Sequence, residues 1–76
     1  GYAPALIEMA EAEQAQGRHK SAQSYLERFF AARGRGAKPL LLGVGIERSL
    51  GSRQGASRYE KLLRQNYPDA PEILSL

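Results

Sequence analysis

The chain has 76 residues, a net charge of +3 and no cysteine, and hydrophobic residues make up 42% of it. This length supports one small domain, and the lack of cysteine excludes disulfides, thiolate metal ligands and a thiol nucleophile. The sequence shows no apolar run long enough to cross a membrane and no signal-peptide pattern.

A repeat of 34 residues organises the sequence. The matched positions are Leu6, Leu40 and Leu74; Glu13 and Glu47; Gly17 and Gly51; Ala22 and Ala56; and Tyr25 and Tyr59. This is the tetratricopeptide period, in which each unit is a helix-turn-helix that buries its apolar face by stacking on its neighbours. We therefore expect an all-α, right-handed superhelix of two helix-turn-helix repeats, residues 1–36 and 37–70, followed by the start of a short C-terminal capping helix at residues 71–76. Two repeats are fewer than such arrays usually need, so we expect a C-terminal piece of a longer array.

The first repeat is predicted to form helices at residues 4–16 and 21–33, separated by a turn at Gly17. The first helix carries Leu6, Ile7 and Met9, which we expect to remain exposed because no unit precedes them. On the second helix, apolar residues three and four apart share one face; they are Ala22, Tyr25, Leu26, Phe29 and Phe30. We expect the two phenylalanines to form the core of this repeat.

The second repeat is predicted to form helices at residues 39–50 and 53–66. The start of its first helix, residues 40–45, could also form a buried strand that leads into a glycine turn. The repeat register favours a helix, although each interior glycine costs about 1 kcal/mol relative to alanine. The second helix should turn Ala56, Tyr59, Leu62 and Leu63 inward. The final segment should lay Ile73, Leu74 and Leu76 over this hairpin.

The sequence gives little support for catalysis. His19 is the only histidine, so no catalytic triad or metal cluster is suggested. Glu13 and Glu47 occupy equivalent positions of different repeats, and we expect each to be partly exposed or paired with an arginine. The glycines at positions 43 and 45 lack the third glycine of a dinucleotide-binding loop, since position 48 is arginine. We expect no enzyme, cofactor or metal site.

A basic segment between the repeats offers an alternative function. Arg33, Arg35 and Lys38 could contact phosphates, which would make the chain a nucleic-acid-binding helical domain. No aromatic platform accompanies these residues, and the other basic residues are spread over several helices. A loop kept soluble by its charge is therefore the preferred interpretation, and we expect no nucleic-acid partner.

The repeat residues also resemble those of a known family. They are Gly17, Ala22, Tyr25-Leu26-Glu27-Arg28, Leu42-Gly43, Ile46, Arg48, Leu50-Gly51, Ala56, Tyr59, Leu63 and Tyr67-Pro68. This pattern is similar to the C-terminal repeats of the PilF/PilW type IV pilus biogenesis lipoproteins, from about Pro4 to Asp69. Its Leu-Gly and closing Tyr-Pro are the more specific elements. Members often carry a basic residue at the position of Gly45.

The resemblance implies a pilotin, a non-enzymatic protein that helps the secretin of the pilus machinery to reach the outer membrane and to oligomerise there. The implied partners are a secretin subunit and neighbouring repeats of the same chain. The implied location is the periplasmic side of the bacterial outer membrane. The resemblance also implies a lipid anchor on the parent chain, and we expect no membrane contact by this part itself.

Repeats of this kind hold partner proteins on a curved surface lined by the first helix of each unit. On this basis we predict partner-binding residues at equivalent places in the two repeats. They are Ile7, Glu11 and Gln14 in the first repeat, and Leu41, Gly45 and Arg48 in the second. Such apolar anchors flanked by charges are typical of protein recognition.

Overall fold

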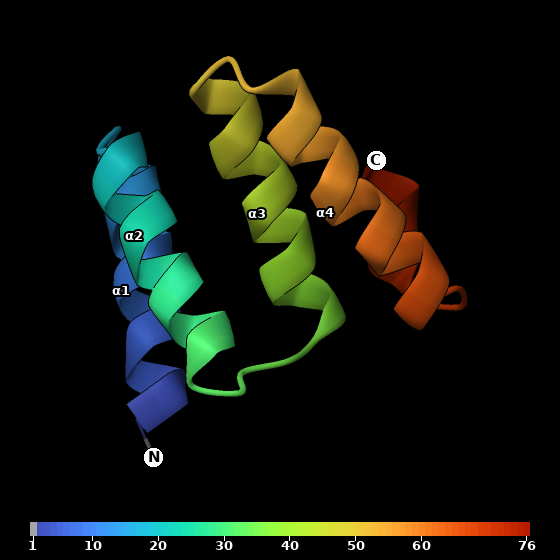
Figure 1. Ribbon diagram of the computed structural model, residues 1–76, viewed down its shortest axis with the longest axis horizontal. Helices are drawn as coiled ribbons and strands as arrows, with labels where there is room; N and C mark the ends of the chain where they lie inside the picture. Colours follow the sequence, from blue (N-terminus) through green and yellow to red (C-terminus); the bar gives the residue numbers. More distant parts are fainter. Residues whose placement is uncertain (1) are drawn as a thin grey trace. The chain divides into compact units, whose positions relative to one another are not determined.

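The computed structural model describes residues 2–76, and every regular element in them is helical (Figure 1). The elements are α1 (Tyr2–Ala15), α2 (His19–Ala31), α3 (Ala37–Ser49), α4 (Arg53–Asn66) and a short 3-10 helix, η1 (Pro71–Ser75). The chain divides into two compact units, unit 1 (Gly1–Arg35) and unit 2 (Gly36–Leu76). Helices α1 and α2 pack together in unit 1, and α3 packs against α4 and η1 in unit 2. The predicted all-α class with helix-turn-helix repeats is confirmed.

The helix boundaries follow the repeat closely. Helix α4 has the predicted bounds, whereas α1, α2 and α3 each begin two residues before the predicted start. Residues 40–45 lie within α3, so the repeat register was the better guide than the strand-like run of leucines. Tertiary packing within the hairpin outweighs the cost of two interior glycines here.

The two hairpins turn in the same way. Gly17 and Gly51 have φ angles of 81° and 75°, a left-handed conformation that glycine adopts without steric cost. The N–H groups of Arg18 and Ser52 donate to the carbonyls of Glu13 and Glu47, each at 2.8 Å, five residues back in the chain. The glycine N–H groups donate to the carbonyls three residues before them, at 3.1 and 3.0 Å. Both first helices therefore end in a Schellman motif, which fixes where the second helix starts.

Helix α2 ends in the same motif with an arginine in the glycine position. Arg33 has a φ of 67°, and the Gly34 N–H donates to the carbonyl of Phe29 at 2.8 Å. A left-handed conformation costs a non-glycine residue roughly 1–2 kcal/mol. Gly34 is needed for another reason, because a Cβ there would lie 2.5 Å from the Phe29 ring. Helix α2 thus ends at Ala31, two residues before its predicted end.

The core of unit 1 lies between its two helices and consists of Leu6, Ala10, Ala22, Leu26 and Phe29. Two expectations for this unit were wrong in part. Leu6 is buried rather than exposed, since it faces its own hairpin, whereas Met9 keeps 45% of its surface exposed. Phe30 is only partly buried; its ring meets the Phe29 ring edge-on, with centroids 5.3 Å apart.

The core of unit 2 depends on a close approach of two helices. The Tyr59 ring of α4 lies directly over Gly43 of α3, where a Cβ would come within 2.8 Å of its carbon atoms. The surrounding core consists of Leu40, Val44, Ile46, Ala56 and Leu63. Position 43 therefore requires glycine, because a larger side chain there would clash with the Tyr59 ring.

Two apolar residues of unit 2 do not lie where the sequence placed them. Leu62 is 37% exposed and Leu74 is 90% exposed, although both were predicted to face the hairpin. The short final helix is a 3-10 helix that packs against α3, and of its predicted apolar contacts Ile73 and Leu76 are partly covered.

The two interior glycines of α3 give a matched test of this packing. Gly43→Ala should lower the unfolding free energy by about 1–3 kcal/mol, because the added methyl group overpacks the Tyr59 ring. Gly45→Ala should raise it by about 0.5–1 kcal/mol, since no atom lies within 4 Å of its Cβ position and alanine favours helix. Thermal unfolding followed by circular dichroism compares the two variants. Equal shifts would contradict the assigned close approach at Gly43.

A second stability test concerns the end of α2. Arg33→Gly should raise the unfolding free energy by about 0.5–1 kcal/mol, because it removes the strain of a left-handed arginine and outweighs the entropy cost of glycine. Arg35→Gly is the control, since it removes the same charge where no left-handed strain is relieved. Chemical denaturation measures both. A destabilised Arg33→Gly variant would show that the arginine side chain itself holds this segment.

Candidate functional site

The six predicted binding residues lie on two helix faces, one in each unit, with the same residue spacing. Ile7, Glu11 and Gln14 lie on α1 and are all partly buried. Leu41, Gly45 and Arg48 lie on α3, the first two partly buried and the third exposed. In each set the spacing is four and then three residues, which brings the side chains onto one face of a helix. We call them the α1 face and the α3 face.

The polar residues of the α1 face also serve the hairpin. The Gln14 Oε1 atom is hydrogen-bonded to His19 Nδ1 at 2.7 Å, which ties the end of α1 to the start of α2. His19 is thus joined to a residue that was predicted to bind a partner. Glu11 also has interactions within the chain. Ile7 is the apolar member of this face.

The α3 face combines an apolar side chain, an open patch of backbone and a cation. Gly45 has no neighbouring atom within 4 Å of its Cβ position, so a partner's side chain could reach the helix backbone there. Leu41 and Arg48 flank this opening one turn away on either side. This arrangement suits recognition of a protein segment that carries an apolar residue and a carboxylate.

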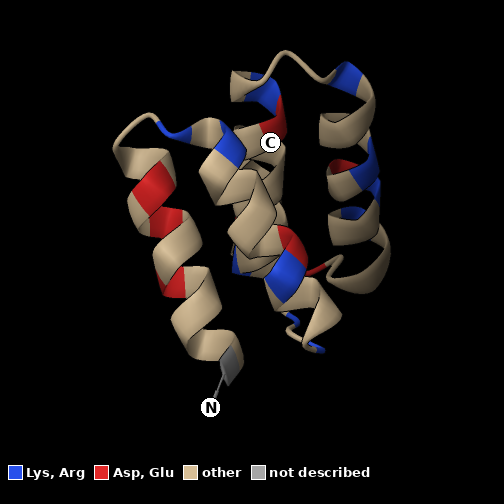
Figure 2. Ribbon diagram, turned by 60° about the vertical axis from the view of Figure 1, so that its left-hand side comes forward, with Lys and Arg blue, Asp and Glu red and all other residues tan. Residues whose placement is uncertain are grey.

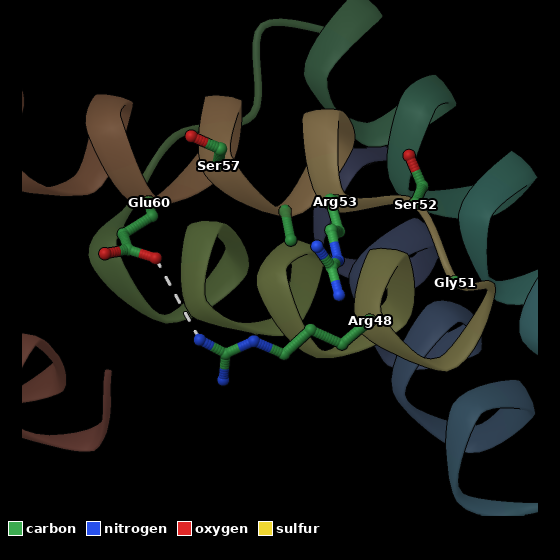
Figure 3. Close-up of a pocket in the computed structure, with 7 residues that line it drawn as sticks. Arg48, Gly51, Ser52, Arg53, Ser57 and Glu60 are labelled. Atoms are coloured by element: carbon green, nitrogen blue, oxygen red, sulfur yellow. Dashed lines mark ion pairs between the residues drawn. The ribbon is translucent and has the colours of Figure 1, made fainter.

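Arg48 also lines a pocket of about 370 Å³ at the turn between α3 and α4 (Figure 3). The other lining residues are Gly51, Ser52, Arg53, Ala56, Ser57 and Glu60. Arg48 reaches toward Glu60, with 3.9 Å between Nη2 and Oε2, and Arg64 approaches the other oxygen of Glu60 at 3.4 Å. The Arg48 side chain remains 55% exposed, so this ion pair is weak and Arg48 stays accessible.

The sequence reasoning did not single out the α4 side of this pocket. Arg53, Ser57 and Glu60 are spaced by four and three residues along α4, so they share one face. That spacing is visible in the sequence and could have identified them. Ser52 is the N-cap of α4, where its hydroxyl accepts a hydrogen bond from the Gly55 N–H at 3.1 Å.

The two repeat-matched glutamates have different surroundings. Glu13 is paired with Arg18 at 3.1 Å and lies 3.4 Å from the Ser21 hydroxyl, as expected for a partly exposed carboxylate. Glu47 is only 5% exposed, and its carboxylate lies against Gly55, the repeat equivalent of Ser21. The missing side chain at position 55 lets Glu47 fold inward over the start of α4. These carboxylates belong to the hairpin turns.

Unit 1 has a surface hollow at the place where, in unit 2, a tyrosine ring packs directly on a helix backbone. Met9 and Tyr25 are the repeat equivalents of Gly43 and Tyr59. They line a hollow together with Ala5, Leu6 and Arg28, whose guanidinium lies 5.5 Å from the centre of the Tyr25 ring. Because Met9 occupies the place of the glycine, the tyrosine ring cannot settle on the helix backbone.

The basic segment between the helices offers exposed charge. Arg33, Arg35 and Lys38 are all exposed, but Arg33 is also the left-handed cap of α2. Lys38 lies in the first turn of α3 and has interactions within the chain. Nucleic-acid binding through these residues stays an untested alternative.

Two further observations bear on the kind of site present. Within residues 2–76, no group of three or more histidine, aspartate or glutamate side chains could hold a metal ion. No helix in the described chain combines the length and the apolar character that spanning a membrane requires.

Comparison with known proteins now gives these faces a context. No protein-family model and no curated protein matches the chain. Among solved structures, the crystal structure of PilW, described as a widely conserved type IV pilus biogenesis factor, superimposes with a TM-score of 0.90 at 31% sequence identity. The match covers 97% of this chain but 34% of that chain, so the present chain spans about a third of PilW. The chain is thus similar, in fold and in sequence, to one part of a type IV pilus biogenesis factor.

Proposed function

We propose that this chain is part of a type IV pilus assembly protein and serves as a non-enzymatic protein-binding module. The observation that carries the proposal is the similarity to PilW across 97% of the chain, with 31% identity. Two hairpins with equivalent, accessible faces on their first helices fit such a role, because repeat proteins of this type bind partners through these helices.

We further propose that the protein acts as a pilotin and that its partner is a secretin subunit. The α1 and α3 faces would supply the contacts, with Ile7 and Leu41 as apolar anchors. Arg48 would meet a carboxylate of the partner, and the exposed backbone at Gly45 would let the partner approach closely. Neighbouring repeats of the longer chain would be the other protein contacts.

The α3 face gives the sharpest test of this proposal. Leu41→Asp should weaken binding of a purified secretin subunit by about tenfold or more, because it places a charge where an apolar anchor should be buried. Arg48→Ala should weaken binding a few-fold without a folding cost, since Arg48 is exposed. Biolayer interferometry measures affinity, and circular dichroism checks that both variants keep their helices.

Two controls accompany these variants. Leu74→Asp makes the same chemical change at a leucine that is 90% exposed, and Arg35→Ala removes an exposed charge outside both faces. Neither should alter secretin binding. If a control abolished binding while folded Leu41→Asp and Arg48→Ala variants retained it, the assignment of the binding faces would be wrong.

The proposed location leads to a separate experiment on the full-length protein. We propose that the parent chain is lipid-anchored and faces the periplasm from the outer membrane. After cell fractionation it should then be found with the outer membrane and should incorporate a labelled fatty acid. Recovery in the cytoplasmic fraction without label would contradict the pilotin proposal and leave the fold unaffected.

A further inference from the structure

Helix α4 carries an excess of positive charge, with one acidic residue among its basic ones (Figure 2). Arg53, Arg58 and Lys61 are exposed, and together with Gln54 and Ser57 they line a shallow groove along the helix. We call these five residues the α4 strip. It contains no acidic residue. The one carboxylate of this helix, Glu60, lies close to Arg48 and Arg64.

The charges of the α4 strip have little compensation within the chain. Across residues 2–76, Arg53 and Lys61 have no ion-pair or hydrogen-bond partner. The Arg58 guanidinium lies 5.8 Å from the centre of the Tyr59 ring, which leaves its charge unneutralised. Glu60 lies on the same side of α4 as Arg53 and Ser57, but it is shared by Arg48 and Arg64, so it neutralises little of the positive charge of the strip.

This arrangement also costs helix stability. Arg53 is the first residue of α4, where the positive end of the helix dipole disfavours a cation, and the first turn contains no acidic residue. Arg58 and Lys61 are like charges three residues apart on the same helix, which also disfavours the helix. A bound anion would relieve both repulsions, so the strip is electrostatically suited to an acidic ligand.

The spacing within the strip indicates the form of that ligand. Arg53 and Lys61 are eight residues apart along α4, which corresponds to about 12 Å. An extended peptide rises about 3.3 Å per residue, so carboxylates about four residues apart would match the two cations. The Ser57 hydroxyl lies midway and could bond a backbone carbonyl of the peptide. Aromatic stacking surfaces, which single-stranded nucleic acids use, are missing from the strip, because Tyr59 is buried.

We propose that the α4 strip binds an acidic segment of a partner protein. This inference goes beyond the proposed secretin contact, because it uses another helix and does not require that the chain act in pilus assembly. Long-range attraction to the strip would speed the encounter with the acidic segment, and ion pairs with Arg53 and Lys61 would fix its register.

The test uses a fluorescein-labelled peptide of alternating glutamate and serine, with its glutamine and serine counterpart as the neutral probe. Fluorescence anisotropy should show binding of the acidic peptide, weaker at higher ionic strength, and no binding of the neutral one. The double variant Arg53→Glu and Lys61→Glu should bind about tenfold more weakly or not at all. Its melting temperature should not fall, because glutamate suits the first turn of a helix.

The matched control is the double variant Lys20→Glu and Arg35→Glu, which changes the net charge equally at exposed positions outside the strip. It should retain binding to within about twofold. Equal losses in the two double variants would show attraction to net charge alone and overturn the proposal. Tighter binding of a labelled single-stranded oligonucleotide to the same strip would also overturn it, in favour of nucleic acid.

Discussion

The left-handed glycine at each hairpin turn is the constraint on which the rest of this structure depends. Gly17 and Gly51 let the chain reverse within three residues while the carbonyls at the end of the first helix stay hydrogen-bonded. Because the two turns are alike, the second helix of each unit starts at the same point of the repeat. Because of this common starting point, residues 34 positions apart are structurally equivalent in the two units, including those of the α1 face and the α3 face.

Once the turns are fixed, two substitutions between the repeats make the units differ. Glycine at position 43 admits the ring of Tyr59 onto the helix, whereas Met9 at the equivalent place leaves Tyr25 at the edge of a hollow. Likewise Gly55 gives Glu47 a buried place, whereas Ser21 at the equivalent position lies beside a more exposed Glu13. Unit 2 is therefore the more tightly joined hairpin at these contacts, and unit 1 keeps an apolar depression.

Most of the fold could be predicted from the sequence because the repeat carries information that local patterns lack. The run Leu40-Leu41-Leu42 is ambiguous by itself, and only its alignment with the first repeat indicates a helix. Side-chain exposure was less predictable. Leu74 shares the repeat position of the buried residues Leu6 and Leu40, but it lies on a short 3-10 helix with no following helix of its own repeat in the described residues, and it is 90% exposed.

The candidate sites were predictable to different degrees. The α1 and α3 faces follow from helix spacing, and they remain predictions as binding sites. The hydrogen bond between Gln14 and His19 could not be foreseen, since it depends on the geometry of the turn. The α4 strip was not predicted because the basic residues outside the segment between the repeats were taken to be spread over several helices. The spacing of Arg53, Ser57 and Lys61 along one helix already placed them together.

The recognition role of the first helices can be tested directly by nuclear magnetic resonance of the labelled chain during titration with a secretin subunit. Backbone amide signals of α1 and α3 should shift, most strongly around Ile7 and Leu41, while those of α2 change little. Shifts confined to η1, or no shifts at concentrations where the full-length protein supports secretin assembly, would contradict recognition through the first helices.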